Sequence, residues 1–254
     1  MPDTAHETVP LAGVSEAEWA LRCDLAACYR LAEKNRMSKV VWNHITARVP
    51  GKDEHILVNR FGLRYDEITA SNLLKIDLDG NTVDGTGDDV MLAAYVIHSA
   101  VHKARPDVVC AMHTHSRGGL GVSALQEGLL PLSQESMLFF EAVGYHGYEG
   151  MADDVDECDR LAANLGSHDH LILLNHGLLT VGRSVGEAYW RMALLEMSCQ
   201  HQMEVLATGR PYVLPPRDVC LHARRQSEEV WPPGVHEWPA LRRQLDRDCP
   251  DYKT

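Results

Sequence analysis

The spacing of apolar and polar residues predicts a chain of mixed helices and strands. Ser15 is followed three positions later by Glu18, a capping pattern that indicates a helix start. Apolar residues then recur at helical spacing and give the expected helix one apolar face up to about residue 34; they are Trp19, Cys23, Ala26, Ala27 and Leu31. The chain is therefore expected to begin its core with an amphipathic helix.

Further along, short apolar runs between turn residues predict strands, and longer periodic segments predict helices. Strands are expected at 40–49, 55–59, 107–114, 130–133, 142–147 and 170–182, with a hairpin at 73–83 that turns at 79–81. Helices are expected at 90–103, 153–165 and 184–207. Grouped strands with flanking helices favour a layered α/β/α domain.

The pattern changes near residue 209 and predicts two parts of the chain. Residues 1–208 are expected to form the domain, and residues 209–254 an irregular tail with short helices, because several prolines interrupt that segment. Trp231 and Trp238 indicate that the tail packs on the domain or on a neighbouring subunit. The alternative is a loosely attached tail.

Composition narrows the classes of protein that fit. The formal net charge of −12 disfavours nucleic acid and anionic membranes as partners. No run of eighteen apolar residues predicts a membrane span, and residues 1–20 lack the pattern of a signal peptide. Seven cysteines without paired spacing suit reduced thiols. The expected location is the cytoplasm.

Three histidines are candidate metal ligands. His113 and His115 stand two apart after an apolar run, so on a strand they share one face. His176 follows a second apolar run, between the turn formers Asn175 and Gly177. Three imidazoles with an open fourth position are typical of catalytic metal sites. Taken alone, an HxH pair is more often two unrelated core or surface histidines.

The surrounding motifs change that balance. Residues 105–116 (RPDVVCAMHTHS) and 173–182 (LLNHGLLTVG) resemble the two signatures of the class II aldolase/adducin superfamily. Residues 41–48 and 76–81 resemble its N-terminal half, so the likeness covers about 15–208. It implies a three-layer α/β/α sandwich with a central, mainly antiparallel sheet. It also implies that His113, His115 and His176 hold a metal, and that a homotetramer carries its site at a subunit interface.

Three features of the sequence depart from the sugar-phosphate aldolases of this family. Their acid/base glutamate stands where this chain has Ala94, and their phosphate-binding serines are replaced by apolar residues at 90–93. Their Gly-Asn-x-Ser loop also differs, since the segment 42–46 reads WNHIT. Alanine cannot transfer a proton, so the standard aldolase mechanism is not expected. Because the phosphate-binding residues are missing, the substrate is expected to be unphosphorylated. Residues 97–106 (IHSAVHKARP) resemble the adducin-like bacterial branch.

Other residues are candidates for the missing proton transfer and for substrate binding. Glu135 matches the position of the aldolases' trans-acting tyrosine and is the expected acid/base, with Gln134 beside it as a substrate-binding residue. Tyr145 is expected to shape the pocket, while Asn43 and His98 are expected to bind substrate. For each, a plain structural or surface role is the alternative. His102, one turn after His98, is expected to face solvent.

These residues favour a metal-dependent carbon–carbon lyase, an aldolase or decarboxylase that acts on an oxo- or hydroxy-acid through a metal-stabilised enolate. One divalent ion is expected as cofactor, zinc first, with iron, manganese or cobalt as alternatives. An iron(II) oxygenase on the same fold and a non-catalytic, adducin-like assembly module are the other hypotheses. Partners are expected to be a small-molecule substrate and further copies of the chain.

Overall fold

The centre of the computed structural model is a seven-stranded sheet with the order β3-β2-β1-β4-β7-β6-β5. The structure describes residues 11–52, 54–83, 92–151 and 156–254. Every neighbouring pair of strands is antiparallel except β5 and β6, which are parallel. The strands are β1 (His44–Arg48), β2 (His55–Val58), β3 (Leu74–Asp77), β4 (Cys110–Thr114), β5 (Gly144–His146), β6 (His170–Leu173) and β7 (Gly177–Gly182).

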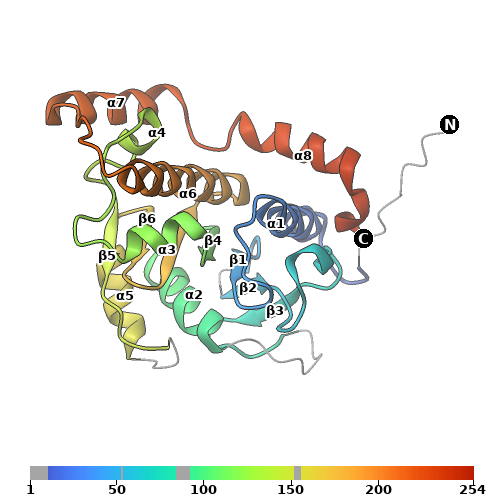
Figure 1. Cartoon of the computed structure of the whole chain (residues 1–254). Coiled ribbons are helices and arrows are strands. Elements are labelled where there is room, and N and C mark those ends of the chain that lie inside the picture. Colours follow the sequence, from blue (N-terminus) through green and yellow to red (C-terminus); the bar gives the residue numbers. More distant parts are fainter. Residues whose placement is uncertain (1–10, 53, 84–91, 152–155) are drawn as a thin grey trace.

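Helices cover both faces of this sheet (Figure 1). Helices α1 (Glu16–Lys34), α3 (Arg117–Ser123) and α6 (Val185–Ala207) lie on one face, and α2 (Leu92–Ala104) and α5 (Glu157–Leu165) lie on the other. This arrangement confirms the three-layer α/β/α sandwich with a mainly antiparallel sheet. It also leaves β1, β4 and β7 in the middle of the sheet, where both of their faces are covered.

Local signals in the sequence explain where the two long helices begin. Ser15 caps α1 by accepting a hydrogen bond from the backbone N–H of Glu18 at 3.2 Å. Ser184 caps α6 in the same way through Glu187, at 3.1 Å. Each cap satisfies a backbone donor that the first helical turn leaves open. Both helices then bury an apolar face against the sheet.

The core divides into two main apolar clusters, one on each side of the sheet. The larger cluster joins α1 and α6 to the strands, with Leu25, Tyr29 and Met192 fully buried. The second cluster joins α2 and α5 to β6 and β7, with Val101 and Leu161 at its centre. These two clusters fix the middle strands, whose ends carry the candidate metal ligands.

The structure corrects several expected elements. No strand forms at 130–133; instead Ser133 caps the short helix α4 (Gln134–Met137). The strand expected at 40–49 begins only at His44, and the run at 170–182 is two strands joined by a turn. The hairpin expected at 73–83 is reduced to β3 and one bridge between Ile76 and Thr82. The expected starts of two helices, at 90–91 and 153–155, lie outside the described residues.

The segment after residue 208 is more regular than its prolines suggest. It contains α7 (Arg217–Val230), α8 (Glu237–Asp248) and a final turn of 3-10 helix, Pro250–Lys253. The end of the segment docks on the domain: the backbone of Tyr252 accepts from Ala70 N–H at 2.8 Å, and Arg30 pairs with Asp251 at 2.9 Å. A division of the chain at residue 208 stays a prediction.

Two further expectations concern membrane-spanning helices and the state of the cysteines. None of the helices in the described part of the chain is long and apolar enough to cross a bilayer. All seven cysteines are free thiols, and five of them are buried.

Candidate metal centre

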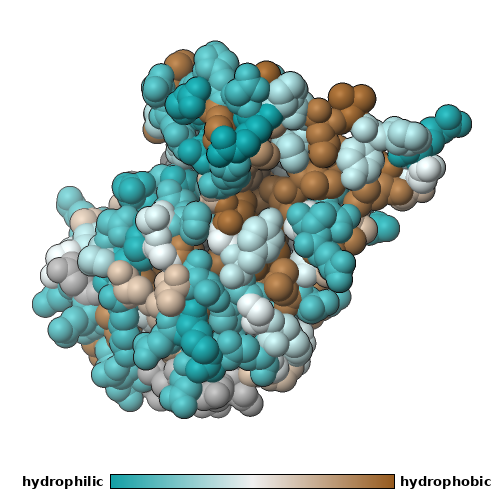
Figure 2. Space-filling view, turned by 90° about the vertical axis from the view of Figure 1, so that its left-hand side faces the viewer, coloured by the Kyte–Doolittle hydropathy of each residue, from teal (hydrophilic) through white to brown (hydrophobic). Residues whose placement is uncertain are grey.

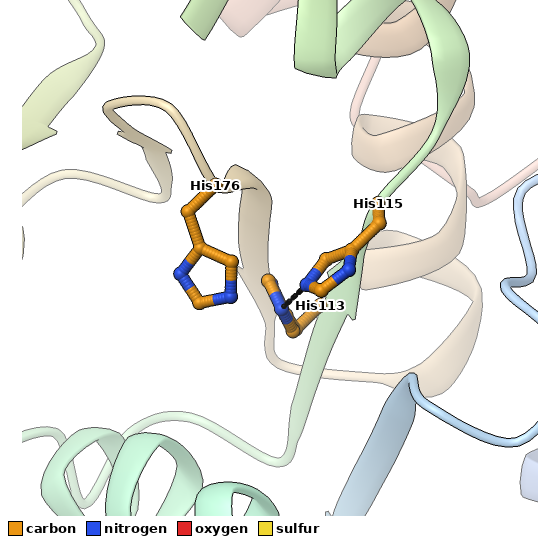
Figure 3. A group of neighbouring side chains, drawn as sticks. All are labelled: His113, His115 and His176. Carbon is orange, nitrogen blue, oxygen red and sulfur yellow. Dashed lines mark hydrogen bonds between the residues drawn. The ribbon is translucent and has the colours of Figure 1, made fainter. Parts of the chain in front are cut away.

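The three candidate histidines come together at one end of the central strands (Figure 3). His113 lies on β4, His115 directly follows that strand, and His176 lies in the turn between β6 and β7. Their ring centroids are 4.8 Å apart in each of the three pairs. One nitrogen from each ring lies within 4.8 Å of the other two. Histidines up to 63 positions apart in the sequence therefore share a single site.

The backbone of the β6–β7 turn places His176. Asn175 and Gly177 both have positive φ, +56° and +146°. At position 177 a Cβ would overlap the carbonyl oxygen of Thr114, so only glycine allows the turn to approach β4 this closely. The N–H of Asn175 also donates to Ser123 O at 2.9 Å. These contacts hold the His176 ring beside the end of β4.

A backbone carbonyl orients the first ligand. His113 Nδ1 lies 2.9 Å from Leu178 O, and a carbonyl oxygen can only accept, so Nδ1 carries the proton. The lone pair of the ring is then on Nε2, which lies 2.9 Å from His115 Nε2. An ion with bonds of about 2.0–2.1 Å holds tetrahedral ligand nitrogens about 3.3 Å apart. Small rotations of the rings would therefore admit a zinc-sized ion.

The protonation states also fit a metal site. Burial lowers the pKa of His113 well below its usual value, and the nearby His176, His44 and His115 lower it further. Burial, assisted by His115, lowers the pKa of His176 to about 4. Burial and the charge of Lys39 lower the pKa of His115. Neutral imidazole is the form that binds metal ions, so the triad is ready to bind at neutral pH.

A buried carboxylate fixes the chain just after His115. Glu196 on α6 is 4% exposed and accepts four hydrogen bonds. They come from Ser116 Oγ at 2.5 Å, the backbone N–H groups of Gly118 and Gly119 at 2.8 and 2.7 Å, and Gln200 Nε2 at 2.7 Å. Glu196 thereby ties the strand-to-helix turn that carries His115 to the long helix behind it. The sequence analysis did not identify this residue.

Two further rings contact the triad, and Asn43 is the residue that precedes one of them in the sequence. The ring of His44 packs on that of His113 at 5.1 Å, because His44 on β1 pairs with His113 on β4. Tyr148 lies with its ring 6.3 Å from that of His176 and is 54% exposed. Asn43 is buried, and neither its amide nitrogen nor its amide oxygen has a hydrogen-bond partner. An unpaired buried amide is costly and points to a ligand or a water molecule at that place.

The other predicted residues fall in different places. Tyr145 lies on β5, and its hydroxyl accepts from Leu129 N–H at 3.1 Å, so it supports the 128–129 loop. Its neighbour Tyr148 contacts the triad in its place. Gln134 and Glu135 lie on α4 and line a cavity formed with α6 and α7, away from the triad of the same chain. Ala94 lies in the first turn of α2.

The two histidines of α2 are both fully covered. His98 is 0% exposed and bonded through both ring nitrogens, so it has no free nitrogen for a substrate. His102 is 1% exposed, and the expectation that it faces solvent is wrong. Their spacing correctly indicated a shared helix face, but that face turns toward the sheet.

Comparison with known proteins identifies the family of the chain. A family profile described as "Class II Aldolase and Adducin N-terminal domain" matches residues 23–203. A solved aldolase II superfamily protein from Pseudomonas syringae is 47% identical, with a TM-score of 0.90 over 95% of this chain and 98% of that one. An L-fuculose 1-phosphate aldolase from Glaciozyma antarctica is 27% identical, with a TM-score of 0.83 over 97% and 98% of the two chains.

The similarity also extends to a eukaryotic protein. Alpha-adducin of Rattus norvegicus is 41% identical over 91% of this chain, which corresponds to 34% of the adducin. The profile match, the relatives and the shared architecture agree with one another. The chain belongs to the class II aldolase and adducin family.

Proposed function

We propose that this protein is a metal-dependent carbon–carbon lyase, an aldolase or a decarboxylase, that acts on an unphosphorylated oxo- or hydroxy-acid. The observation that carries the proposal is the cluster of three neutral histidines with converging nitrogens. His113, His115 and His176 would hold one divalent ion, zinc first among the candidates. Such an ion supplies Lewis-acid stabilisation of the negative charge that develops on an enolate oxygen.

The residues around the triad suit a small acid. Lys39 is exposed, and after burial its charge is the second cause of the lowered pKa of His115. A cation that affects this ring would also attract a substrate carboxylate. The unpaired amide of Asn43 can both donate and accept, which suits a carbonyl or hydroxyl oxygen. Tyr148 offers an aromatic wall beside His176.

The sequence supports the proposal that the substrate carries no phosphate group. Ala94 stands where the sugar-phosphate aldolases have their acid/base glutamate, and the segment WNHIT replaces their phosphate loop. The similarity to the Glaciozyma antarctica aldolase makes L-fuculose 1-phosphate the first compound to test against the proposal. Aldol cleavage of it at about 1 s⁻¹ or faster, an ordinary enzyme rate, would contradict an unphosphorylated substrate.

Glu135 is the proposed acid/base, and it would act across a subunit boundary in a homo-oligomer, most simply a tetramer. In the single chain it lies in the cavity between α4, α6 and α7 rather than at the triad. Exposed apolar side chains concentrate around α7, which suits contact with another copy; they are Tyr212, Val213, Leu214, Val219, Val230 and Trp231. Figure 2 views the side of the molecule that is at the left in Figure 1, and it shows hydrophobic residues, in brown, in a band below the upper projection.

Subunit mixing tests the role of Glu135. Glu135→Gln keeps the size and hydrogen bonding of the side chain and removes its charge, so turnover should fall about 100-fold or more while metal content is kept. Mixed oligomers of Glu135→Gln and His176→Ala should regain part of the activity, since some interfaces then combine one intact half from each subunit. A monomer by light scattering, or mixtures without regained turnover, would contradict the proposal.

The main experiment measures metal and turnover together. Protein purified without oxygen is analysed for zinc, manganese, cobalt and iron, and then assayed with a panel of 2-oxo and 2-hydroxy acids before and after chelation. We expect about one divalent ion per chain and a turnover that disappears with the ion. Turnover that survives chelation would overturn the proposal, and an iron-dependent uptake of dioxygen would favour the oxygenase.

A second candidate function is an assembly module without catalysis. The 41% identity to alpha-adducin favours it. The retained histidine cluster argues against it, because a scaffold has no use for converging neutral imidazoles. A protein that purifies without any divalent ion and regains none on dialysis would support the assembly module.

A further inference from the structure

A line of polar side chains runs behind the metal centre, between the sheet and α2. His44, Thr46 and Arg48 alternate along β1 and so share one face, while His98 and His102 share one face of α2. His44 Nδ1 lies 2.7 Å from His98 Nε2, and His98 Nδ1 lies 2.6 Å from Thr46 Oγ1. Thr46 Oγ1 lies 2.9 Å from His102 Nε2, and His102 Nδ1 lies 3.4 Å from Arg48 Nη2. The five side chains form one continuous path.

Burial keeps the three imidazoles of this path neutral. His44, His98 and His102 are each at most 2% exposed. Burial lowers the pKa of His98 well below the usual value and lowers that of His102 to about 3. A neutral ring carries a single N–H and a single lone pair. When the Thr46 hydroxyl donates to one of its two ring partners and accepts from the other, the chain can run in two directions, with every ring protonated on Nε2 or every ring protonated on Nδ1.

Arg48 favours one direction. A guanidinium has donors only, so its contact with His102 Nδ1 at 3.4 Å is a hydrogen bond only if that nitrogen has its lone pair and His102 carries its proton on Nε2. The Val108 carbonyl, the competing acceptor for a proton on His102 Nδ1, accepts from Arg48 Nε at 3.2 Å, which leaves it one lone pair for a further donor. His102 Nε2–H donates to Thr46 Oγ1, and the Thr46 hydroxyl donates to His98 Nδ1. His98 Nε2–H then donates to His44 Nδ1, which leaves His44 protonated on Nε2.

The last ring of the path adjoins the metal centre. His44 packs against His113, with the two ring centroids 5.1 Å apart. Its Nδ1 is turned to His98, so Nε2 is at the opposite side of the ring. Among the described residues, the hydrogen bond to His98 is the one that the ring of His44 makes, and it leaves Nε2 open. A donor without a partner therefore stands beside the three ligands.

We propose that His44 is a further residue of the metal centre, and that it presents its Nε2–H as a fixed hydrogen-bond donor to a small oxyanion bound there. His98, Thr46, His102 and Arg48 are positioning residues that set the tautomer of His44. This role rests on the proposed function, since it supposes an ion at the triad. In the lyase reaction the donor would share the negative charge that develops on the substrate oxygen.

The direction of the chain is tested in metal-free protein, by nuclear magnetic resonance of histidines labelled with ¹⁵N and ¹³C. Single substitutions assign the signals. We expect His44, His98 and His102 all to be Nε2–H tautomers, and an Nδ1–H tautomer at His44 would overturn the proposal. Thr46→Val keeps the shape but removes the hydroxyl, so His44 should become a mixture of tautomers. Thr46→Ser keeps the hydroxyl and should preserve the spectrum; equal spectra for both variants would overturn the relay.

The donor itself is tested with Co²⁺ as the metal and oxalate as the oxyanion. His44→Phe keeps a ring without a donor and should weaken oxalate binding by about tenfold or more, as expected for a lost hydrogen bond to a charged group. His44→Gln keeps a donor and should bind oxalate within about threefold of the unaltered protein. Cobalt affinity should be equal in all three proteins.

The outcomes separate the two proposals. Unchanged oxalate affinity in His44→Phe would overturn the donor role, and lost cobalt in that variant would make His44 a ligand instead. An unaltered protein that binds no cobalt would overturn the proposed function and the role of His44 at a metal. The tautomers are measured in metal-free protein, so that experiment tests the chain of hydrogen bonds whether or not the protein binds cobalt.

Discussion

The two faces of β1 and β4 are equally buried, yet they have opposite chemistry. Toward α1 and α6 the strands present mostly apolar side chains, namely Ile45, Ala47, Cys110 and Met112, with Thr114 at the end of β4 as the exception. Toward α2 they present mostly polar ones, namely His44, Thr46, Arg48 and His113. Burial alone therefore does not separate core from site. The polar face is tolerated because nearly every group on it is hydrogen-bonded, and the groups left open lie beside the triad.

The largest expected effect lies on the polar side. His115→Ala should lower the affinity for zinc by about 100-fold to 1000-fold, because roughly 10–16 kcal/mol for four-ligand zinc sites is about 2.5–4 kcal/mol per ligand. Equilibrium dialysis with elemental analysis measures it. His222→Ala, on the exposed side of α7, is the matched control and should bind zinc normally. Full zinc retention in His115→Ala would remove the triad as the site.

The apolar side of the same strand should respond in stability instead. Met112 is 0% exposed, so Met112→Ala should lower the free energy of unfolding by about 2–5 kcal/mol. Urea unfolding measures it, and Met112→Leu should cost less than about 1.5 kcal/mol. Zinc affinity should be unchanged in both variants. A Met112→Ala protein that folds normally but loses zinc would show that the two faces are not separable.

The polar face should also give the protein its acid sensitivity. Burial lowers the pKa of His102, which is covered by this face, to about 3, below the value of about 6.5 in an unfolded chain. Unfolding therefore takes up protons below pH 6.5. In chelated protein, each such histidine should lower the free energy of unfolding by about 1.4 kcal/mol per pH unit between pH 6 and 5. Met112→Ala should keep this slope, and a flat profile would contradict the buried neutral rings.

The smallest effect concerns Glu196, a buried carboxylate on α6. All the groups that surround Glu196 are donors, so Glu196→Gln would turn an amide N–H₂ toward them. The free energy of unfolding should fall by about 1–3 kcal/mol. Zinc affinity should fall slightly, because the turn after His115 loosens. Glu204→Gln, on the exposed side of the same helix, should change neither.

Local patterns predicted much of the fold, and the resemblance to the class II aldolase/adducin family was needed to single out the three histidines. Spacing placed two histidines on one strand face and a third between turn formers, and the grouping of strands and helices favoured a layered domain, but the mainly antiparallel sheet came from the resemblance. The strand expected at 130–133 was wrong because Leu130 and Leu132 look like a strand, whereas Ser133 caps a helix. The tail was misread because Pro216 and Pro239 stand at helix starts, where a missing N–H costs nothing.

The residues that the sequence analysis did not single out, or placed wrongly, depend on contacts between distant segments. His44 gains its place from pairing with His113, and His102 is buried because α2 lies against β1. Tyr148 reaches the triad only because the chain bends after β5. Glu196 is 80 positions from the serine that it binds. A single sequence gives no register between such elements, so side-chain spacing cannot reveal these partners.

The docking of Pro250–Lys253 on the first helix has a consequence for synthesis on the ribosome. Arg30 meets its partner Asp251 only 221 residues later. At roughly 5–20 residues per second, translation needs roughly 10–45 s to cover that distance. During this interval α1 has emerged but lacks part of its final cover, so apolar surface on it stays open to chaperones. The nascent chain should therefore resist protease at α1 only after residue 253 has left the exit tunnel.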